Sequence, residues 1–180
     1  MPASIFAPAQ LGALPLRNRI IKTATYEGMT PGGVPSPALT EHHVTLARGG
    51  VGMTTVAYCA VSSAGRTFGE QMYMRDAIVP HLQALTAAVH AAGAKVSLQL
   101  GHCGAFSKNK ELPGRRPLAP SFAINRYGLM AGMPFTRAMT ERDMEQVIDE
   151  FGSAASAAVR AGFDAVELHL GHGYLLSQFI

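Results

Sequence analysis

The last twelve residues of this chain carry its clearest chemical groups. Two imidazoles and a phenol, those of His169, His172 and Tyr174, occur within six positions. Two histidines can donate hydrogen bonds to one oxygen atom, and a neutral tyrosine nearby can deliver a proton. These residues follow a short apolar run at 163–168, which is typical of a buried strand. Such groups at the carboxyl end of a strand predict a reaction site.

Strand-like and helix-like segments alternate upstream of these residues. Apolar and β-branched runs predict four strands, at 19–24, 51–57, 94–100 and 163–168. Helical spacing predicts helices between them, at 40–48, 77–92 and 140–161. Thr140-Glu-Arg-Asp143 resembles a capping box, and we expect a buried helix face after it, made of Met144, Val147, Ile148, Phe151, Ala155 and Ala158. The histidines of the helical segments, at 42, 43, 81 and 90, are expected on the surface.

Three strand–helix–strand crossovers predict a parallel sheet. The candidates are a (βα) barrel and an open, doubly wound sheet. No G-x-G-x-x-G follows the first strand, so a Rossmann dinucleotide site has no support. Polar residues and glycines follow several strand ends, as the catalytic rim of a barrel requires. We therefore favour an α/β fold, a TIM (β/α)8 barrel of which this chain supplies four βα units.

The interval 103–140 is too long for an ordinary loop between a strand and a helix. Its prolines and aromatic residues are compatible with a lid or substrate-channel wall over the barrel rim, and equally with a packed surface loop. It also holds a loose basic cluster, which we interpret mainly as a solvated loop and otherwise as a contact for an anionic ligand. The cluster consists of Lys108, Lys110, Arg115 and Arg116.

Composition limits the classes of protein to consider. The 180 residues are 48% hydrophobic and 15% charged, with a net charge of +3. These values fit a globular protein and give no support to nucleic-acid binding, which needs a denser basic stripe. No apolar run is long enough to cross a membrane, and the start lacks a secretory signal, so a cytoplasmic location is the default. Cys59 and Cys103 are expected to be reduced thiols, although they could lie close together.

Four segments together resemble the Old Yellow Enzyme family of FMN-dependent NADH:flavin oxidoreductases. They are Leu16-Arg-Asn-Arg-Ile-Ile21, Gln99-Leu-Gly-His102-Cys-Gly104, Ala161-Gly-Phe-Asp-Ala-Val-Glu167 and His169-x-x-His172-Gly-Tyr174-Leu-Leu-x-Gln-Phe179. The resemblance is to the N-terminal half of these enzymes, in a bacterial branch like the 2,4-dienoyl-CoA reductases and xenobiotic reductases. It implies a TIM barrel with FMN over its mouth and an ene-reductase that uses NAD(P)H to reduce the C=C bond of an α,β-unsaturated carbonyl or related compound.

The resemblance also implies roles for individual residues. Tyr174 matches the catalytic proton donor, and His169 and His172 match the pair that binds the activating oxygen of the substrate. The residues that match the cofactor-binding positions for FMN are Thr23, Ala24, Thr25, Tyr58 and Gln99. Three departures affect this transfer of roles. Tyr26 stands where some relatives place a flavin-tuning cysteine, Ala105 stands where many have arginine, and Tyr58 is bulkier than the usual residue.

The same residues have structural interpretations. His169 and His172 can be satisfied core histidines, or metal ligands if His102 supplies a third, although we expect no metal. Tyr174 can simply pack in the rim, and Gln99 can cap a strand end. The spacing of the two histidines alone favours a structural role, and the complete motif reverses that preference.

A full barrel takes about 250 residues, and only four strands are predicted here. We therefore expect residues 1–180 to be the N-terminal half of a flavin-binding barrel, a truncated part of a longer enzyme that binds FMN poorly alone. Its expected partners are a small-molecule substrate and the remainder of the barrel, and a homo-oligomer is compatible with the sequence. The alternative is a non-catalytic half-barrel that acts as an interaction or assembly module.

Overall fold

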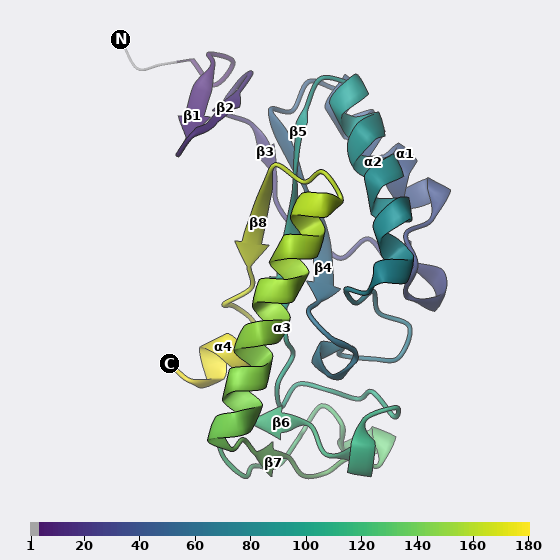
Figure 1. The fold of residues 1–180 in the computed structure, drawn as a ribbon, viewed down its shortest axis with the longest axis vertical. Helices are drawn as coiled ribbons and strands as arrows, with labels where there is room; N and C mark the ends of the chain where they lie inside the picture. Colours follow the sequence, from purple (N-terminus) through teal and green to yellow (C-terminus); the bar gives the residue numbers. More distant parts are fainter. Residues whose placement is uncertain (1–3) are drawn as a thin grey trace.

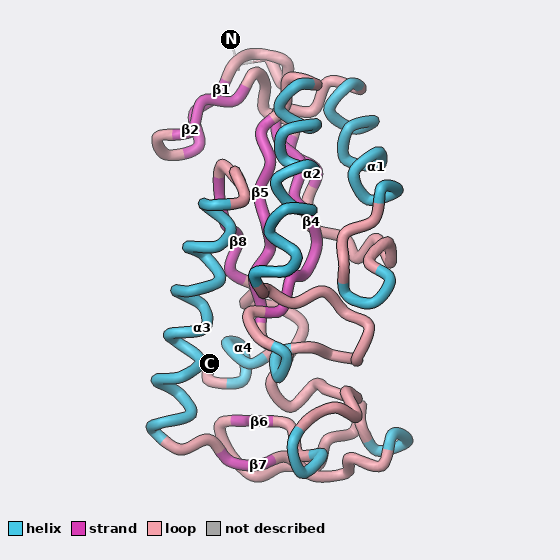
Figure 2. The backbone as a smooth tube through the Cα atoms, turned by 45° about the vertical axis from the view of Figure 1, so that its right-hand side comes forward, coloured by secondary structure: helices cyan, strands magenta, loops and turns pink. Residues whose placement is uncertain are grey.

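The computed structural model describes residues 4–180 as a parallel sheet with helices packed against one face (Figures 1 and 2). The central sheet has four parallel strands in the order β3-β4-β5-β8. Their bounds are Ile21–Lys22, Met53–Ala60, Lys95–Gly101 and Ala165–Leu168. This order follows the sequence order of the four predicted strands, as expected for consecutive βα units. The predicted α/β fold with a parallel sheet is confirmed.

Three helices connect the strands of the sheet and cover one of its faces (Figure 2). They are α1 (Pro37–Arg48), α2 (Val79–Ala91) and α3 (Glu141–Arg160). The core lies between these helices and strands β4 and β5, and is built from aliphatic side chains such as Leu39, Leu82, Leu85, Val96 and Leu98. Burial of this apolar face stabilises the layer arrangement. Among residues 4–180, no helix is both long and apolar enough to span a bilayer.

Smaller elements flank the sheet (Figure 1). An antiparallel hairpin of β1 (Ala9–Leu11) and β2 (Leu14–Leu16) lies near the N-terminus, at the amino ends of the sheet strands. At the opposite, carboxyl end lie the short parallel pair β6 (Leu118–Ala119) and β7 (Arg137–Ala138), and the single-turn helix α4 (Leu175–Gln178). The carboxyl end is therefore the covered end of the sheet.

The helix starts follow their capping residues. α1 begins at Pro37, three residues earlier than predicted, because the side chain of Ser36 accepts a hydrogen bond from the Leu39 backbone N–H. α3 begins as predicted with a reciprocal capping box between Thr140 and Asp143. Arg137 adds two hydrogen bonds to the same carboxylate.

Replacing Thr140 with alanine is expected to destabilise the fold by about 1 kcal/mol, because the Asp143 backbone N–H loses its acceptor. Urea unfolding of the variant measures this loss. Thr45→Ala, on the exposed side of α1, serves as a control for the loss of a threonine from a helix and should change stability by less. Equal stability of Thr140→Ala and the unchanged protein would contradict the role of the cap.

Two predictions about burial are wrong. His43 is completely buried, and its Nδ1 lies 2.7 Å from the hydroxyl of Thr54, because this side of α1 faces β4. Ile148, expected in the core, is 68% exposed on α3, where Ala154 and Ala157 face the sheet instead. Helical spacing gives the phase of an apolar stripe but does not say which part of a broad stripe another element covers.

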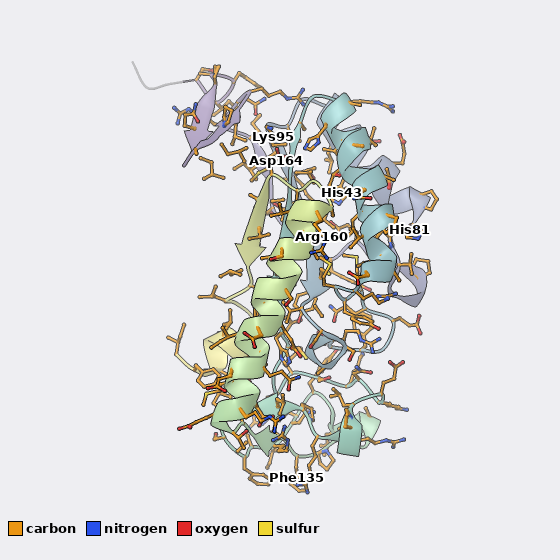
Figure 3. The ribbon with its side chains drawn as sticks, viewed as in Figure 1. His43, His81, Lys95, Phe135, Arg160 and Asp164 are labelled. Carbon is orange, nitrogen blue, oxygen red and sulfur yellow. The ribbon has the colours of Figure 1, made fainter. Side chains whose placement is uncertain are left out.

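One polar cluster joins the amino ends of β5 and β8. Asp164 accepts hydrogen bonds from the backbone N–H of Val96 and from the ammonium of Lys95, at 2.9 and 2.8 Å. The Nε2 atom of His90, at the end of α2, lies 2.7 Å from Oδ2 of the same carboxylate. Figure 3 shows Lys95 and Asp164 side by side at the end of the sheet far from Phe135. This cluster fixes the position of β8, which leads directly to the histidines.

Candidate active site

A cavity of about 470 Å³ lies at the carboxyl end of the sheet, within the usual size range of ligand pockets. Residues after all four sheet strands contribute to its wall, as expected for the catalytic face of a barrel. The lining residues are Ala24, Thr25, Tyr26, Ala57, Tyr58, Thr67, Phe68, Gln71, Gln99, Phe106, Tyr127, His169, His172 and Tyr174. Seven of the eight predicted site residues are therefore brought together; Thr23 is not among the residues that line the cavity.

The two histidines face each other across the loop that follows β8. His169 Nε2 and His172 Nδ1 are 3.1 Å apart. The backbone N–H of Gly171 donates to His169 Nδ1, which leaves Nε2 as the protonated nitrogen of a neutral ring. Burial, together with the neighbouring His172, lowers the pKa of His169, so this ring is neutral at pH 7. His172 has a left-handed backbone, with φ of 59°, which brings its ring toward His169.

Tyr174 lies against the same pair, with its ring centroid 4.7 Å from that of His169. The side chain is partly buried, and its hydroxyl lies 3.4 Å from the hydroxyl of Thr67. Burial raises the pKa of Tyr174, so the phenol keeps its proton throughout the neutral range. The backbone position is fixed by the start of α4, which the tyrosine precedes. A phenolic proton is therefore available next to two imidazoles.

A bulge in β4 directs Tyr58 into the site. Neighbouring strand residues normally point to opposite faces, yet Ala57 and Tyr58 both line the cavity. The pairing of β4 with β5 shifts register between Val56 and Cys59, and this irregularity re-aims the intervening side chain. The Tyr58 hydroxyl donates to the carbonyl of Gly65 at 2.7 Å, and its ring makes edge contacts with both His169 and Tyr174.

Gly101 makes room for the Tyr58 ring. A Cβ at position 101 would lie 2.5 Å from Tyr58 Cε2 and 3.2 Å from His169 Cβ, so any side chain there would displace the tyrosine or the histidine. The large ring of Tyr58 on β4 therefore fits because the residue beside it on β5, Gly101, has no side chain.

Part of the cavity lining has groups that suit a flavin ring. Ala24 and Ala57 present small side chains, and Thr25 and Gln99 present a hydroxyl and an amide. Gln99 donates one N–H to Glu167 on the adjacent strand at 2.6 Å, which orients the amide and leaves its carbonyl oxygen and second N–H for a ligand. Hydrogen-bonding groups together with small side chains fit the polar edge and the face of an isoalloxazine ring.

Several lining residues were not predicted as site residues. Thr67, Phe68 and Gln71 come from the loop after β4, and Phe106 and Tyr127 come from the segment 103–140. The rings of Phe106 and Tyr127 are stacked, 4.1 Å apart at 12°, and Phe106 also contacts Tyr174. The aromatic content of the segment was the only sequence signal for this wall.

His102 and the two cysteines lie outside the cavity lining. Cys59 and Cys103 are buried and unpaired, as predicted, and burial raises the pKa of each thiol to about 12. His102 is also buried; its Nδ1 accepts from the Gly104 backbone N–H, while no partner for Nε2 is found among residues 4–180. Burial lowers the pKa of His102 to about 4.

His102 is expected to make the fold sensitive to acid. Between pH 6.5 and about 4, the unfolded chain protonates this imidazole and the folded chain does not, so stability falls as pH falls. Between pH 7.5 and 5 this contribution is about 2 kcal/mol. His102→Asn, which keeps an acceptor near the Gly104 N–H, should lose less stability over the same range, as measured by urea unfolding. The same pH dependence in both proteins would contradict this assignment.

The match to a family model identifies the class of protein. Residues 4–180 match the NADH:flavin oxidoreductase / NADH oxidase family. The chain belongs to this family, whose members use FMN with NAD(P)H as reductant. The predicted membership of this family is thereby confirmed.

Individual relatives agree with this assignment. The chain is 46% identical to a 4,4'-dithiodibutanoate disulfide reductase from Rhodococcus erythropolis. The aligned region covers 98% of this chain and 43% of that enzyme. Its structure is similar to morphinone reductase in complex with tetrahydroNAD, with a TM-score of 0.85 and 28% identity, covering 98% of this chain and 52% of that one. It is also similar to Old Yellow Enzyme from Pichia sp. AKU4542, with a TM-score of 0.87 and 25% identity, covering 97% and 48%.

The chain covers only part of each relative, and this coverage shows which part of the fold is present. The chain spans 43% of the disulfide reductase and about half of the two enzymes of known structure. The structure is therefore a partial TIM barrel, and the rest of the barrel is missing from this chain. Both the predicted barrel class and the predicted resemblance to Old Yellow Enzyme are confirmed.

Proposed function

We propose that the protein containing this chain is an FMN-dependent ene-reductase, which uses NAD(P)H to reduce the C=C bond of an α,β-unsaturated carbonyl compound. The observation that carries the proposal is the convergence of His169, His172 and Tyr174 on one cavity. The cofactor-binding residues that we propose are Ala24, Thr25, Tyr58 and Gln99, which line that cavity, and Thr23, which neighbours them in sequence.

Ala24, Thr25 and Gln99 would hold FMN, which would supply hydride-transfer chemistry for the β-carbon of the substrate. His169 binds the carbonyl oxygen through its Nε2–H, and His172 binds the same oxygen once its proton is on Nδ1. These two N–H groups stabilise the negative charge that develops on the oxygen. The hydroxyl of Tyr174 transfers its proton to the α-carbon, and its raised pKa keeps that proton in place until the reaction requires it.

We propose that the remainder of the barrel packs against two exposed surfaces of this chain, the edge of β8 and the outer side of α3. Strand β8 has its far edge unpaired in the described part of the chain, and its residues Val166 and Leu168 are 40% and 51% exposed. Ile148 and Val159, at 68% and 72%, form an apolar stripe on the outer side of α3. Large exposed apolar side chains beside a sheet edge are typical of a surface that another element covers. The segment 103–140 is proposed as the lid of the completed site.

A second candidate activity is reduction of a disulfide compound. The observation that favours it is the 46% identity to an enzyme named for 4,4'-dithiodibutanoate. Among residues 4–180, those that line the cavity include no cysteine, so this part of the site supplies no thiol for exchange with a disulfide. Membership of an oxidoreductase family favours either activity over the non-catalytic interaction module.

Anaerobic stopped-flow absorbance of the complete, FMN-loaded protein tests the proposal. NADH or NADPH should bleach the flavin, and 2-cyclohexenone should restore its colour in a second mixing step. Restoration by 4,4'-dithiodibutanoate and not by the enone would select the second activity instead. A flavin that NAD(P)H reduces but that neither compound reoxidises would overturn both substrate assignments.

A further inference from the structure

We infer that Lys108 binds the carboxylate of the substrate, so that the site selects unsaturated carbonyl compounds with an acid group remote from the C=C bond. This inference rests on the proposed function and adds the class of substrate to it. It starts from the aromatic wall that the segment 103–140 contributes to the cavity.

The ammonium of Lys108 lies over two rings of the cavity lining, one from this segment and one from the loop after β4. Lys108 Nζ is 5.1 Å from the ring centroid of Tyr127 and 5.9 Å from that of Phe68, and both rings line the cavity. An ammonium is attracted to the faces of aromatic rings at such distances. The lysine is therefore drawn toward the rim of the cavity, although its side chain is solvent-exposed.

The backbone that carries this lysine is held in place. The Lys108 N–H donates to the carbonyl of Thr67 at 2.8 Å. The neighbouring Ser107 is completely buried, and its hydroxyl donates to the carbonyl of Arg66 at 2.9 Å. Two adjacent residues thus connect the segment 103–140 to the loop after β4, which fixes the point from which the ammonium reaches the rim.

The charge of Lys108 has no protein counterion within residues 4–180. Lys108 borders a second, outer hollow, which shares Phe68 with the main cavity and is also lined by Glu70 and Glu111. Each of these two carboxylates has another partner. Glu111 pairs with Arg66 at 2.6 Å, and Glu70 accepts a hydrogen bond from the Gly32 backbone N–H at 3.0 Å. Among residues 4–180, those that line the main cavity include no aspartate or glutamate. An anionic group at the rim therefore meets the ammonium of Lys108 beside two carboxylates that are each engaged elsewhere, and no carboxylate in the described cavity lining.

A continuous run of rings separates the lysine from the reacting groups. The ring of Tyr174 contacts His169 and Phe106, Phe106 stacks on Tyr127, and Lys108 lies over Tyr127. A substrate whose carbonyl oxygen lies between the histidines would pass an apolar spacer along Phe106 and Tyr127. Its carboxylate would then reach the ammonium at the rim. The predicted substrate is thus a carbonyl compound with an acid at the far end of an apolar chain.

Calorimetry with a non-reacting ligand tests this inference independently of catalysis. The probe is 3-(4-hydroxyphenyl)propanoate, whose phenol oxygen suits the histidine pair, compared with its uncharged methyl ester. In the complete, FMN-loaded protein the acid should bind roughly tenfold more tightly than the ester, since a hydrogen bond to a charged group contributes about that much. Lys108→Met should remove this difference and leave binding of the ester unchanged.

Lys110→Met is the matched control, because Lys110 borders the outer hollow and belongs to the same basic cluster. It should keep the preference for the acid. Equal affinities of acid and ester in the unchanged protein would overturn the inference, and so would a preference that survives Lys108→Met. Failure of the enzyme to reduce any enone would count against the proposed activity alone, because the binding comparison does not depend on turnover.

Discussion

Tyr174→Phe should slow reoxidation of the reduced flavin by 2-cyclohexenone about 10²- to 10⁴-fold, the usual contribution of a positioned proton donor. The phenyl ring keeps the contacts with His169 and Phe106 but has no proton to give. Reduction of the flavin by NAD(P)H should be almost unchanged, because that step does not use the phenol. Single-turnover stopped-flow measurements of the two half-reactions separate these effects.

Tyr127→Phe is the control for this experiment. Tyr127 lines the same cavity and stacks on Phe106, but its ring is not among those in contact with either histidine. Its loss of a hydroxyl should leave both half-reactions nearly unchanged. If Tyr174→Phe slowed both half-reactions equally, the tyrosine would have a structural role and the proton donor would lie elsewhere.

Substitution of His169 or His172 by alanine should weaken the binding of phenols by roughly 10- to 100-fold, since each removes a hydrogen bond to a charged oxygen. Titration of the flavin charge-transfer band with a simple phenol measures this affinity in the FMN-loaded protein. Because His169 Nε2 and His172 Nδ1 lie 3.1 Å apart, the effects of the two substitutions should be non-additive in the double variant.

His81→Ala is the matched control, since His81 is an exposed histidine on α2, far from the histidine pair in sequence (Figure 3). It should leave the affinity for phenols unchanged. An undiminished charge-transfer band in His169→Ala and His172→Ala would remove both histidines from the proposed oxygen site.

The cavity accommodates two of the three departures from the pattern of the relatives, Tyr58 and Tyr26. Tyr58 is large, but the bulge in β4 and the missing side chain at Gly101 accommodate its ring beside His169 and Tyr174. Tyr26, at the position of a flavin-tuning cysteine in some relatives, also lines the cavity. Both positions therefore add aromatic surface to the site, which favours ligands with an extended apolar part.

The order of the main elements and the types of the reacting groups could be predicted from the amino-acid sequence. Period-two and helical spacing are local properties, so the four strands and three helices were predictable, and so was the capping box of Thr140 and Asp143. His169, His172 and Tyr174 lie within six residues of one another, so their proximity also follows from local sequence. The long interval 103–140 was recognisable as an excursion, but the sequence left its role open between lid and surface loop.

The contacts between distant segments could not be predicted and are known from the three-dimensional structure. The direction of Tyr58 depends on a register shift against β5, and the burial of His43 depends on which side of α1 faces β4. The position of Lys108 over Tyr127 depends on contacts between two long loops. These features depend on contacts between segments far apart in the chain. Local periodicity carries no information about them, because burial and direction depend on which element packs across from a residue.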